Sequence, residues 1–420
     1  MPGSESPVSL SSLALRPSLG AGTPTCTAAI GCGRLAAVVC ADNLILLTLI
    51  HPSIFSFTGK LTADLVALDD TYSWFRSRLI LGGRSPASLQ PLAERTNLPF
   101  RAFSLTDQDI DTHLHDVRVV IHMAGPFIAT AEPMLRACIR TRTHYLDITG
   151  EMPVFDLVYE KMRAEIEAAG ILAICGVGFD IVPTDCLAAQ LAQALPDGTH
   201  LELGIAPTGK GANLTAGTAS SAVEGMANPN MVMGPRIDGK IVNKAPGYKS
   251  KYIDFPTAGR KFTSFIPWGD CYTAYISTSI PNVDVYFPSV WPLDTVTYYG
   301  SPLLQLALKV PGVKPTLLSL IRKFVTGPSA EASATGRVDV WGHVRNAVTG
   351  ESVSGYVVLP EGYKFTGLAA LESARRVFEG RVKKNKGSLT PSLAFGWEYV
   401  KDIPGVSVGE VTVHEVKVDG

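Results

Sequence analysis

The 420-residue sequence predicts an α/β fold in which a parallel-sheet domain is followed by a second, α+β domain. From Ile50 to Cys175, short apolar runs alternate with longer amphipathic stretches, the pattern of strand–helix–strand units. After Pro183 the chain changes character, beginning with a loop rich in Gly, Ser and Thr over residues 208–221. Later segments alternate apolar and polar residues, which favours a sheet with one solvated face.

The first half contains short apolar runs separated by segments with helical periodicity. Strands are expected at residues 44–50, 78–82, 100–103, 117–123, 145–148 and 171–175. Helices are expected at residues 60–67, 86–96, 107–114, 132–140, 154–169 and 185–194. The clearest strand ends in Ala124-Gly125-Pro126, where glycine permits an unusual backbone and proline stops the strand. Residues 44–186 are therefore expected to form a Rossmann-like parallel-sheet domain.

The second half predicts a different architecture. Loose alternation of apolar and polar residues indicates strands within 272–285, 336–345 and 353–359, followed by a helix over 366–378. We therefore expect an α+β domain with a mixed or antiparallel sheet over residues 187–380 and a C-terminal segment over 381–420. Residues 1–43 are rich in Ser, Pro, Gly and Thr and are expected to be a disordered or atypical N-terminal extension.

Composition excludes several classes of function. The formal net charge of −1 gives no positive field to collect nucleic acid, so a small-molecule partner is expected. The seven cysteines are odd in number and scattered, without a CxxC pair, which argues against a disulfide framework and a zinc site. We expect no bound metal and a reducing compartment.

Cytoplasmic localisation is the resulting expectation, with two alternatives at the N-terminus. An acid-poor, Ser-rich terminus resembles a mitochondrial transit peptide, although it has few arginines. The apolar residues 35–57 could contact a lipid surface, but Asp42 and Asn43 interrupt the run of about 20 apolar residues that a membrane span needs. Membrane contact is therefore not expected, and a buried strand is favoured.

A dinucleotide site needs glycines between the first strand and the first helix, so that pyrophosphate can approach backbone N–H groups. The matching segment here ends in Phe57-Thr58-Gly59-Lys60-Leu61, which resembles the end of the GATGFTGKL turn of extended Rossmann reductases. Thr58 and Gly59 are thus candidate cofactor-binding residues. Ser53 and Ser56 stand where that pattern has glycine, and Phe55 stands where it has threonine.

The ends of two later strands supply the other candidate cofactor-binding residues. Arg84 and Ser85 follow the second strand, where the adenosine ribose is read, and a cation there favours the 2′-phosphate of NADP over the free hydroxyl of NAD. Gly125 and Pro126 follow the strand 117–123, where Gly125 could admit the nicotinamide ribose. We expect NADP, with NAD as the alternative.

Three successive segments resemble signatures of the saccharopine dehydrogenase-like family. They are VVIHMAGPF at 119–127, THYLDITGE at 143–151 and CGVGFDIVPTD at 175–185. GPS at 327–329, GYKFT at 362–366 and TPSLAFG at 390–396 resemble the trans-acting enoyl reductase branch of that family. The resemblance covers residues 54 to 410, and the third signature carries two residues more than the family's shorter form.

The resemblance implies a Rossmann domain, a substrate domain, a C-terminal segment that returns to the first domain, and hydride transfer from NAD(P)H. For the enoyl reductase branch it implies an unsaturated acyl substrate, free or carried on a polyketide or fatty-acid synthase in secondary metabolism. Two alternatives stay open. One is a pseudoenzyme or scaffold whose altered glycine loop has lost nucleotide binding, and the other is a saccharopine dehydrogenase-type C–N oxidoreductase.

An enoyl reduction also needs a group that delivers a proton to the substrate. Tyr145 is the candidate donor, and Asp147 and Asp180 are candidate catalytic groups near the expected interdomain cleft, together with Glu151 and Asp185. Each has a structural alternative, because a tyrosine on a strand can belong to the core and an aspartate can anchor a turn or cap a helix. The sequence assigns no individual role among them.

Overall fold

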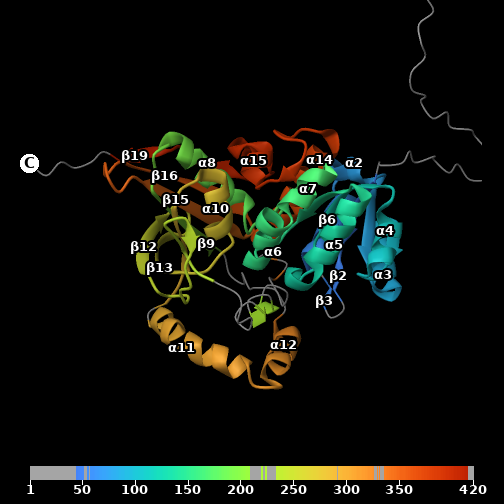
Figure 1. Ribbon diagram of the computed structural model, residues 1–420, viewed down its shortest axis with the longest axis horizontal. Coiled ribbons are helices and arrows are strands. Elements are labelled where there is room, and N and C mark those ends of the chain that lie inside the picture. Colours follow the sequence, from blue (N-terminus) through green and yellow to red (C-terminus); the bar gives the residue numbers. More distant parts are fainter. Residues whose placement is uncertain are drawn as a thin grey trace, which may run out of the picture. The chain divides into compact units, whose positions relative to one another are not determined.

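The computed structural model describes residues 44–51, 54–55, 57–208, 219–220, 223–224, 233–290, 292–325, 329, 331 and 335–414. The predicted N-terminal extension 1–43 lies outside these residues, as does most of the predicted loop 208–221. The predicted fold class is confirmed, since one parallel sheet and one mixed sheet each carry helices (Figure 1).

Seven parallel strands form the first sheet, in the order β17-β8-β7-β6-β1-β4-β5. They are β1 (Leu44–Thr48), β4 (Leu79–Gly83), β5 (Phe100–Ala102), β6 (Val117–His122), β7 (His144–Asp147), β8 (Leu172–Ile174) and β17 (Gly387–Ser388). A short hairpin of β2 (Ile50–His51) and β3 (Ile54–Phe55) follows β1.

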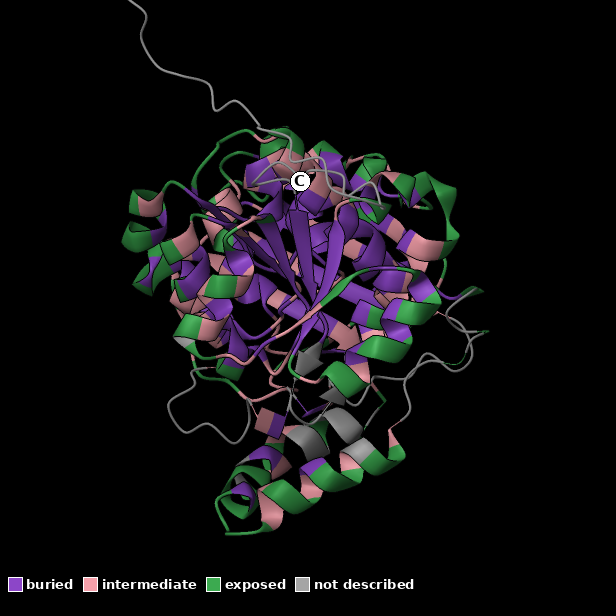
Figure 2. Cartoon of the chain, turned by 90° about the vertical axis from the view of Figure 1, so that its right-hand side faces the viewer, coloured by how far each residue is buried: buried purple, intermediate pink, exposed green. Residues whose placement is uncertain are grey.

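Helices cover both faces of this sheet. They are α1 (Phe57–Leu68), α2 (Ser73–Arg76), α3 (Pro86–Thr96), α4 (Asp107–Leu114), α5 (Phe127–Thr141), α6 (Met152–Asp156) and α7 (Arg163–Ala169), with the 3-10 turn η1 (Asp70–Tyr72) and the π-helical turn η2 (Leu157–Lys161). The residues of β1 alternate between two apolar cores, with Ile45 and Leu47 in one and Leu44 and Leu46 in the other. Burial of both faces explains the continuous apolar runs of these strands (Figure 2).

The second sheet is mixed. Its strands are β9 (His200–Thr208), β10 (Arg236–Ile237), β11 (Lys240–Ile241), β12 (Ser250–Phe255), β13 (Gly259–Phe265), β14 (Asn282–Pro288), β15 (Arg337–Arg345), β16 (Ser352–Pro360), β18 (Ser407–Val408) and β19 (Thr412–His414). Strands β9 and β14 pair in parallel, and the other pairs are antiparallel.

The remaining helices are α8 (Val182–Ala194), α10 (Asp270–Thr278), α11 (Leu293–Leu308), α12 (Val313–Phe324), α14 (Gly362–Glu379), α15 (Pro391–Phe395) and the 3-10 turn η3 (Trp397–Asp402). Helix α8 packs on β15, where a Cβ on Gly342 would lie 2.7 Å from the Leu191 side chain, so glycine permits the close approach. Helix α14 packs in the same way on α1, where a Cβ on Gly367 would lie 3.0 Å from Thr62 Oγ1.

Two predicted elements were wrong. The segment 272–285 was expected to be strand, but α10 occupies its first half, because Cys271 and Ala274 share a helical face buried against α8 and β14. The single helix expected over 154–169 is divided by η2, where the Met162 N–H donates to the Leu157 carbonyl oxygen at 2.8 Å, a five-residue step.

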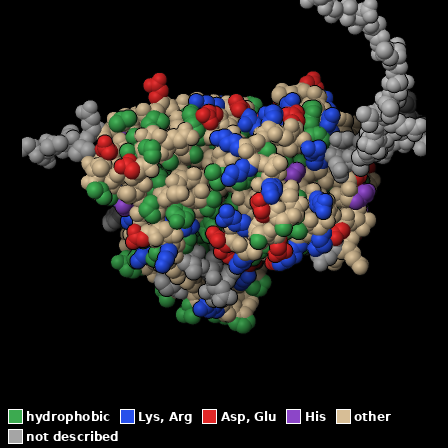
Figure 3. Space-filling model, turned by 45° about the horizontal axis from the view of Figure 1, so that its top comes forward, with side chains coloured by type: hydrophobic (Ala, Val, Ile, Leu, Met, Phe, Trp, Pro, Cys, Tyr) green, Lys and Arg blue, Asp and Glu red, His purple; other side chains and the backbone are tan. Residues whose placement is uncertain are grey.

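Acidic and basic side chains interleave on the face drawn in Figure 3. Partly exposed ion pairs join neighbouring helices, such as Arg95 with Asp64 and Arg140 with Asp111. Within the described part of the chain, no helix is both long enough and apolar enough to span a bilayer.

Candidate functional site: the carboxyl edge of the parallel sheet

The carboxyl ends of β4, β1 and β6 lie side by side in the sheet. All six predicted cofactor-binding residues follow one of these three strands. Thr58 and Gly59 lie in the first turn of α1, which follows β1 and its hairpin. The pair 84–85 follows β4, and the pair 125–126 follows β6. Ligands of open parallel sheets bind at this edge, so the predicted residues are grouped where a dinucleotide would lie.

Helix α1 presents an N-terminus without an acidic residue. Thr58 and Gly59 are buried in its first turn, and the Thr62 hydroxyl donates to the Thr58 carbonyl oxygen at 2.8 Å. No acid occurs in that turn, so no side-chain carboxylate there competes for the positive end of the helix dipole. The α1 N-terminus has the polarity that a pyrophosphate needs.

Two neighbouring helices at this edge carry carboxylates on their own N-termini. The Phe127 and Ile128 N–H groups of α5 donate to the two carboxylate oxygens of Glu151, at 3.0 and 2.7 Å. The Tyr363 and Lys364 N–H groups of α14 donate to Glu361 Oε2, both at 3.0 Å. These two N-termini are already occupied by protein carboxylates, whereas the first turn of α1 carries none.

The segment between β1 and α1 is only partly described. Ser53 and Ser56, predicted to disturb the glycine loop, lie outside the described residues. The backbone of Phe55 belongs to β3, which pairs with β2 in a small hairpin. The predicted obstruction of phosphate by Phe55 therefore stays a prediction.

Arg84 is an exposed cation at the end of β4. None of the described residues forms an ion pair or hydrogen bond with its side chain. The half-buried Ser85 stands at the N-cap of α3, where its side chain makes no capping hydrogen bond. Both side chains are thus available to an external acceptor, as the NADP prediction requires.

The strands β7 and β8 bring two carboxyl groups to the same edge. Glu151 follows β7 and Asp180 follows β8, and a Cβ on Gly150 would lie 3.0 Å from Asp180 Oδ2. Burial and the neighbouring Glu151 carboxylate raise the pKa of Asp180 to about 7. A carboxyl group with this pKa can hold a proton at neutral pH, which suits a general acid.

Two residues distant in sequence hold the loop that carries Asp180. The Trp268 indole N–H donates to the Asp180 carbonyl oxygen at 3.0 Å, and the Phe179 N–H donates to Thr366 Oγ1 at 3.0 Å. A Cβ on Gly178 would lie 2.6 Å from the Thr366 side chain, so glycine is needed for this contact. Asp180 is therefore fixed between β8, the segment after β13 and helix α14.

The positions of Tyr145 and Asp147 do not support the catalytic roles predicted for them. Both side chains are completely buried, and Tyr145 belongs to the core beneath α5 and α6. Asp147 Oδ1 accepts the Thr149 and Gly176 N–H groups at 3.0 and 2.9 Å, so this carboxylate anchors the turns after β7 and β8. A proton donor must reach its substrate, and of the three predicted catalytic residues Asp180 is the one whose side chain is not completely buried.

Burial also changes the pKa values of Tyr145 and Asp147. Burial raises the pKa of Asp147 to about 6, against the opposing effect of the two N–H donors. Burial and the nearby Asp147 carboxylate raise the pKa of Tyr145 well above its usual value, so its hydroxyl keeps its proton. We assign Asp147 a positioning role for the turn that carries Gly150 and Glu151.

His122 is a second buried polar group near this edge. Its ring nitrogens lie 2.7 Å from Thr48 Oγ1 and 2.9 Å from Thr130 Oγ1, and Thr130 also donates to the Ala124 carbonyl oxygen at 2.7 Å. Burial lowers the pKa of His122 to about 3, so the ring is neutral. This network ties β1, β6 and α5 together immediately before Gly125.

The residues that hold Asp180 were not predicted. Trp268 lies 88 residues after Asp180, and Thr366 lies 187 residues after Phe179. Thr366 ends the GYKFT segment, but nothing in the local sequence of either residue marks this contact. Glu151 is among the polar groups predicted near the expected cleft, because it follows a predicted strand after a short turn. Its role on the α5 N-terminus needed the three-dimensional structure.

Comparisons with known proteins agree with this geometry. Residues 55–174 match the family model of the saccharopine dehydrogenase NADP binding domain. A saccharopine dehydrogenase-like oxidoreductase from Mus musculus is 28% identical over 143 residues, which are 31% of this chain and 33% of the relative. A trans-acting enoyl reductase from Mycobacterium leprae is 30% identical over 141 residues, 32% of this chain and 33% of that relative. The chain thus spans about a third of the length of these curated relatives.

The apo saccharopine dehydrogenase (L-Glu forming) from Saccharomyces cerevisiae has a similar fold. It matches with a TM-score of 0.56 and 14% identity over 89% of this chain and 100% of that chain. The predicted resemblance is confirmed for the nucleotide-binding domain by sequence and for both domains by fold.

Proposed function

We propose that this chain, whose residues 55–174 are a saccharopine dehydrogenase NADP binding domain, is an NADP(H)-dependent reductase of a carbon–carbon double bond conjugated to an acyl carbonyl. The observation that carries the proposal is the grouping along one sheet edge of an acid-free helix N-terminus, an arginine that no described residue pairs, and a carboxyl group that holds a proton. The names of the relatives support reduction of an acyl substrate, and their partial coverage leaves that step a proposal.

The residues at this edge fit a bound NADP. The N–H groups of α1 around Thr58 and Gly59 would hold the pyrophosphate, and Arg84 with Ser85 would hold the 2′-phosphate. Gly125 lacks a side chain where the chain leaves β6, which leaves room for a ribose beside Pro126. When bound, NADPH supplies the hydride for the reduction.

Asp180 is the residue we assign to proton delivery. Burial and Glu151 keep a proton on its carboxyl group near neutral pH, and its loop is held by Trp268 and Thr366. The Asp180 carboxyl would give its proton to the carbon beside the acyl carbonyl and recover one from solvent. Proposed substrates are free or carrier-bound unsaturated acyl groups, which includes a partner synthase in secondary metabolism.

A nucleotide titration tests the first part of this proposal. NADPH fluorescence would be titrated with wild-type chain and with Arg84→Asp, and NADH would be titrated in parallel. Loss of a charge-assisted contact to the 2′-phosphate should weaken NADPH binding at least about tenfold. NADH has no such phosphate, and its affinity should change little. Arg260→Ala, which removes an exposed arginine from β13, is the matched control.

A reductase assay tests the second part. NADPH oxidation would be followed with an unsaturated acyl thioester, and with an α-keto acid plus an amino acid to detect C–N bond formation. Turnover of the thioester supports the proposal. Turnover of the keto acid alone would instead indicate a C–N oxidoreductase. Binding of neither nucleotide by the wild-type chain would favour a scaffold that has lost its cofactor.

A further inference from the structure

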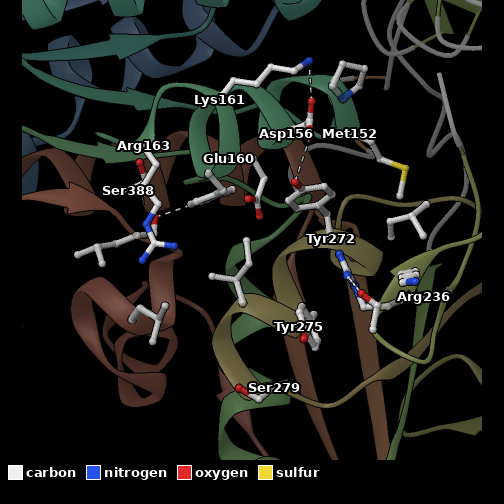
Figure 4. Close-up of a pocket in the computed structure, with 18 of the residues that line it drawn as sticks. Met152, Asp156, Glu160, Lys161, Arg163, Arg236, Tyr272, Tyr275, Ser279 and Ser388 are labelled. Carbon is white, nitrogen blue, oxygen red and sulfur yellow. Dashed lines mark hydrogen bonds and ion pairs between the residues drawn. The ribbon is translucent and has the colours of Figure 1, made fainter. Parts of the chain in front are cut away.

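A deep groove runs along the outer face of the helical segment between β7 and β8. It encloses about 950 Å³ and is lined by α6 and η2 on one wall, by α10 and the β10–β11 turn on the other, and by residues around β17. The groove begins at Met152, one residue beyond Glu151 of the sheet edge (Figure 4). Its volume is in the range that holds a small organic ligand.

Arg236 is a buried cation in this groove that forms no ion pair with a described carboxylate, although the Glu160 carboxylate is near enough to act on its charge. Its side chain is 7% exposed, and no described acid forms an ion pair with it. The Arg236 Nε donates to the Cys271 carbonyl oxygen at 2.9 Å, and Nη1 donates to the Gly239 carbonyl oxygen at 2.6 Å. Those two bonds fix the guanidinium plane, while Nη2 makes no hydrogen bond to a described residue.

Burying a charge that no ion pair neutralises costs free energy. A bound anionic ligand would offset that cost. The free edge of Arg236, formed by Nη2 and the second N–H of Nη1, is a fork that matches two oxygens of a carboxylate or phosphate. Backbone bonds already hold the fork in place, so little side-chain entropy would be lost on binding.

The other charged side chains that line the groove also favour an anionic ligand. Lys161 is paired with Asp156 at 2.7 Å, which leaves one further carboxylate, Glu160, among the lining residues. Besides Arg236 and the paired Lys161, three more cations line the groove: Arg163, Lys240 and Lys384. Arg163 and Arg236 lie on opposite sides of the view in Figure 4, so positive charge is present along the length of the groove.

Two tyrosine rings provide an apolar surface beside Arg236. The guanidinium carbon lies 4.4 Å from the ring centroid of Tyr275 and 5.4 Å from that of Tyr272. Tyr272 and Tyr275 both line the groove, together with Ile276 and Leu393. A ligand whose anionic group meets Arg236 would place its carbon skeleton against these side chains.

We propose that this groove is a second ligand site, which binds an organic carboxylate or phosphate ester through the free edge of Arg236 and the rings of Tyr272 and Tyr275. The site is separate from the proposed nucleotide site at α1 and Arg84. Its existence does not depend on the proposed reductase activity.

Calorimetric titration of the full chain with phenyl phosphate, benzoate and inorganic phosphate tests the site. Phenyl phosphate or benzoate should bind with a Kd of about 1 mM or tighter, and inorganic phosphate more weakly because it lacks an apolar part. The tighter of the two aromatic probes identifies whether a phosphate or a carboxylate is preferred. Benzamide, which is neutral, should not bind.

Arg236→Lys keeps the charge and removes the fork, and it should weaken both aromatic anions at least about tenfold. Lys261→Gln, an exposed lysine of β13, is the control and should leave the affinity unchanged. Because Arg236 also joins the β10–β11 turn to α10, Arg236→Lys could unfold. In that event Tyr275→Leu is the test of the site. This variant should weaken phenyl phosphate binding and leave inorganic phosphate binding unchanged.

Three results would overturn the proposal. They are absence of binding to the wild-type chain, equal affinity in a folded Arg236→Lys or in Tyr275→Leu, and displacement of phenyl phosphate by saturating NADPH. The last result would place the probe in the nucleotide site. A chain that binds phenyl phosphate but no nucleotide would sustain this site while the proposed reductase fails.

Discussion

Asp180→Asn should remove a pH-dependent loss of stability from the folded chain. Burial and Glu151 raise the pKa of Asp180 from 3.8 to about 7, a shift of about three units. At about 1.36 kcal/mol per unit this sets a ceiling of about 4 kcal/mol. The half-buried side chain is partly screened by solvent, so about 2 kcal/mol is the expected size.

The sign follows from proton binding. Below pH 4 the Asp180 carboxyl is protonated in both the folded and the unfolded chain, and its favourable contribution is fully present. Between pH 4 and 7 the unfolded chain releases this proton while the folded chain retains it, so the free energy of unfolding falls as pH rises. Asp180→Asn does not titrate. It should therefore match the wild type near pH 4 and be about 2 kcal/mol more stable at pH 8.

Thermal unfolding followed from pH 4 to 8 measures this difference. Asp254→Asn, an exposed aspartate of β12, is the matched control and should follow the wild-type curve. Parallel curves for the wild type and Asp180→Asn across the whole range would refute the argument that Asp180 is protonated at neutral pH. The same variant should lower the kcat of the proposed reduction about 100-fold or more, with NADPH affinity unchanged.

Three other substitutions address the supports of the edge, each followed by thermal unfolding. Glu151→Ala removes the carboxylate from the α5 N-terminus and should cost about 1 kcal/mol, whereas an unchanged midpoint would show that the cap contributes nothing. Gly178→Ala places a Cβ 2.6 Å from the Thr366 side chain and should cost about 1–3 kcal/mol; a neutral effect would mean that the loop moves freely. Trp268→Phe leaves the Asp180 carbonyl oxygen without its donor and should cost about 1–3 kcal/mol, with Trp397→Phe as the control.

The sequence predicts the parallel sheet well because both faces of its strands are buried. Short apolar runs such as 44–47 and 119–121, followed by glycine or proline, indicate buried strands. Parallel strands place their carboxyl ends together. Chain order therefore predicts that Arg84 and Gly125 lie at one edge, where the structure has them, and their cofactor binding stays a prediction. The domain bounds, in contrast, follow from composition and stay predictions.

The catalytic residues were harder to predict because both faces of strand β7 are buried. Tyr145 and Asp147 share one face of β7, and Leu146 lies on the other, in the second core. Sequence alternation finds the two faces but cannot say that both are covered by helices. The support of Asp180 by Trp268 is a contact between distant segments, and α10 depends on burial against α8, so neither has a local signal.

The serines in the altered glycine loop affect phosphate binding through backbone freedom and space. Phosphate binding at a helix N-terminus uses backbone N–H groups, and serine supplies the same N–H as glycine. Ser53 and Ser56 therefore change the permitted backbone and the space above it, not the number of donors. Glu151 and Glu361 occupy the N-termini of α5 and α14, whereas the first turn of α1 holds no acid. Nucleotide affinity then depends on whether the segment before α1 leaves that helix open, which the NADPH titration measures directly.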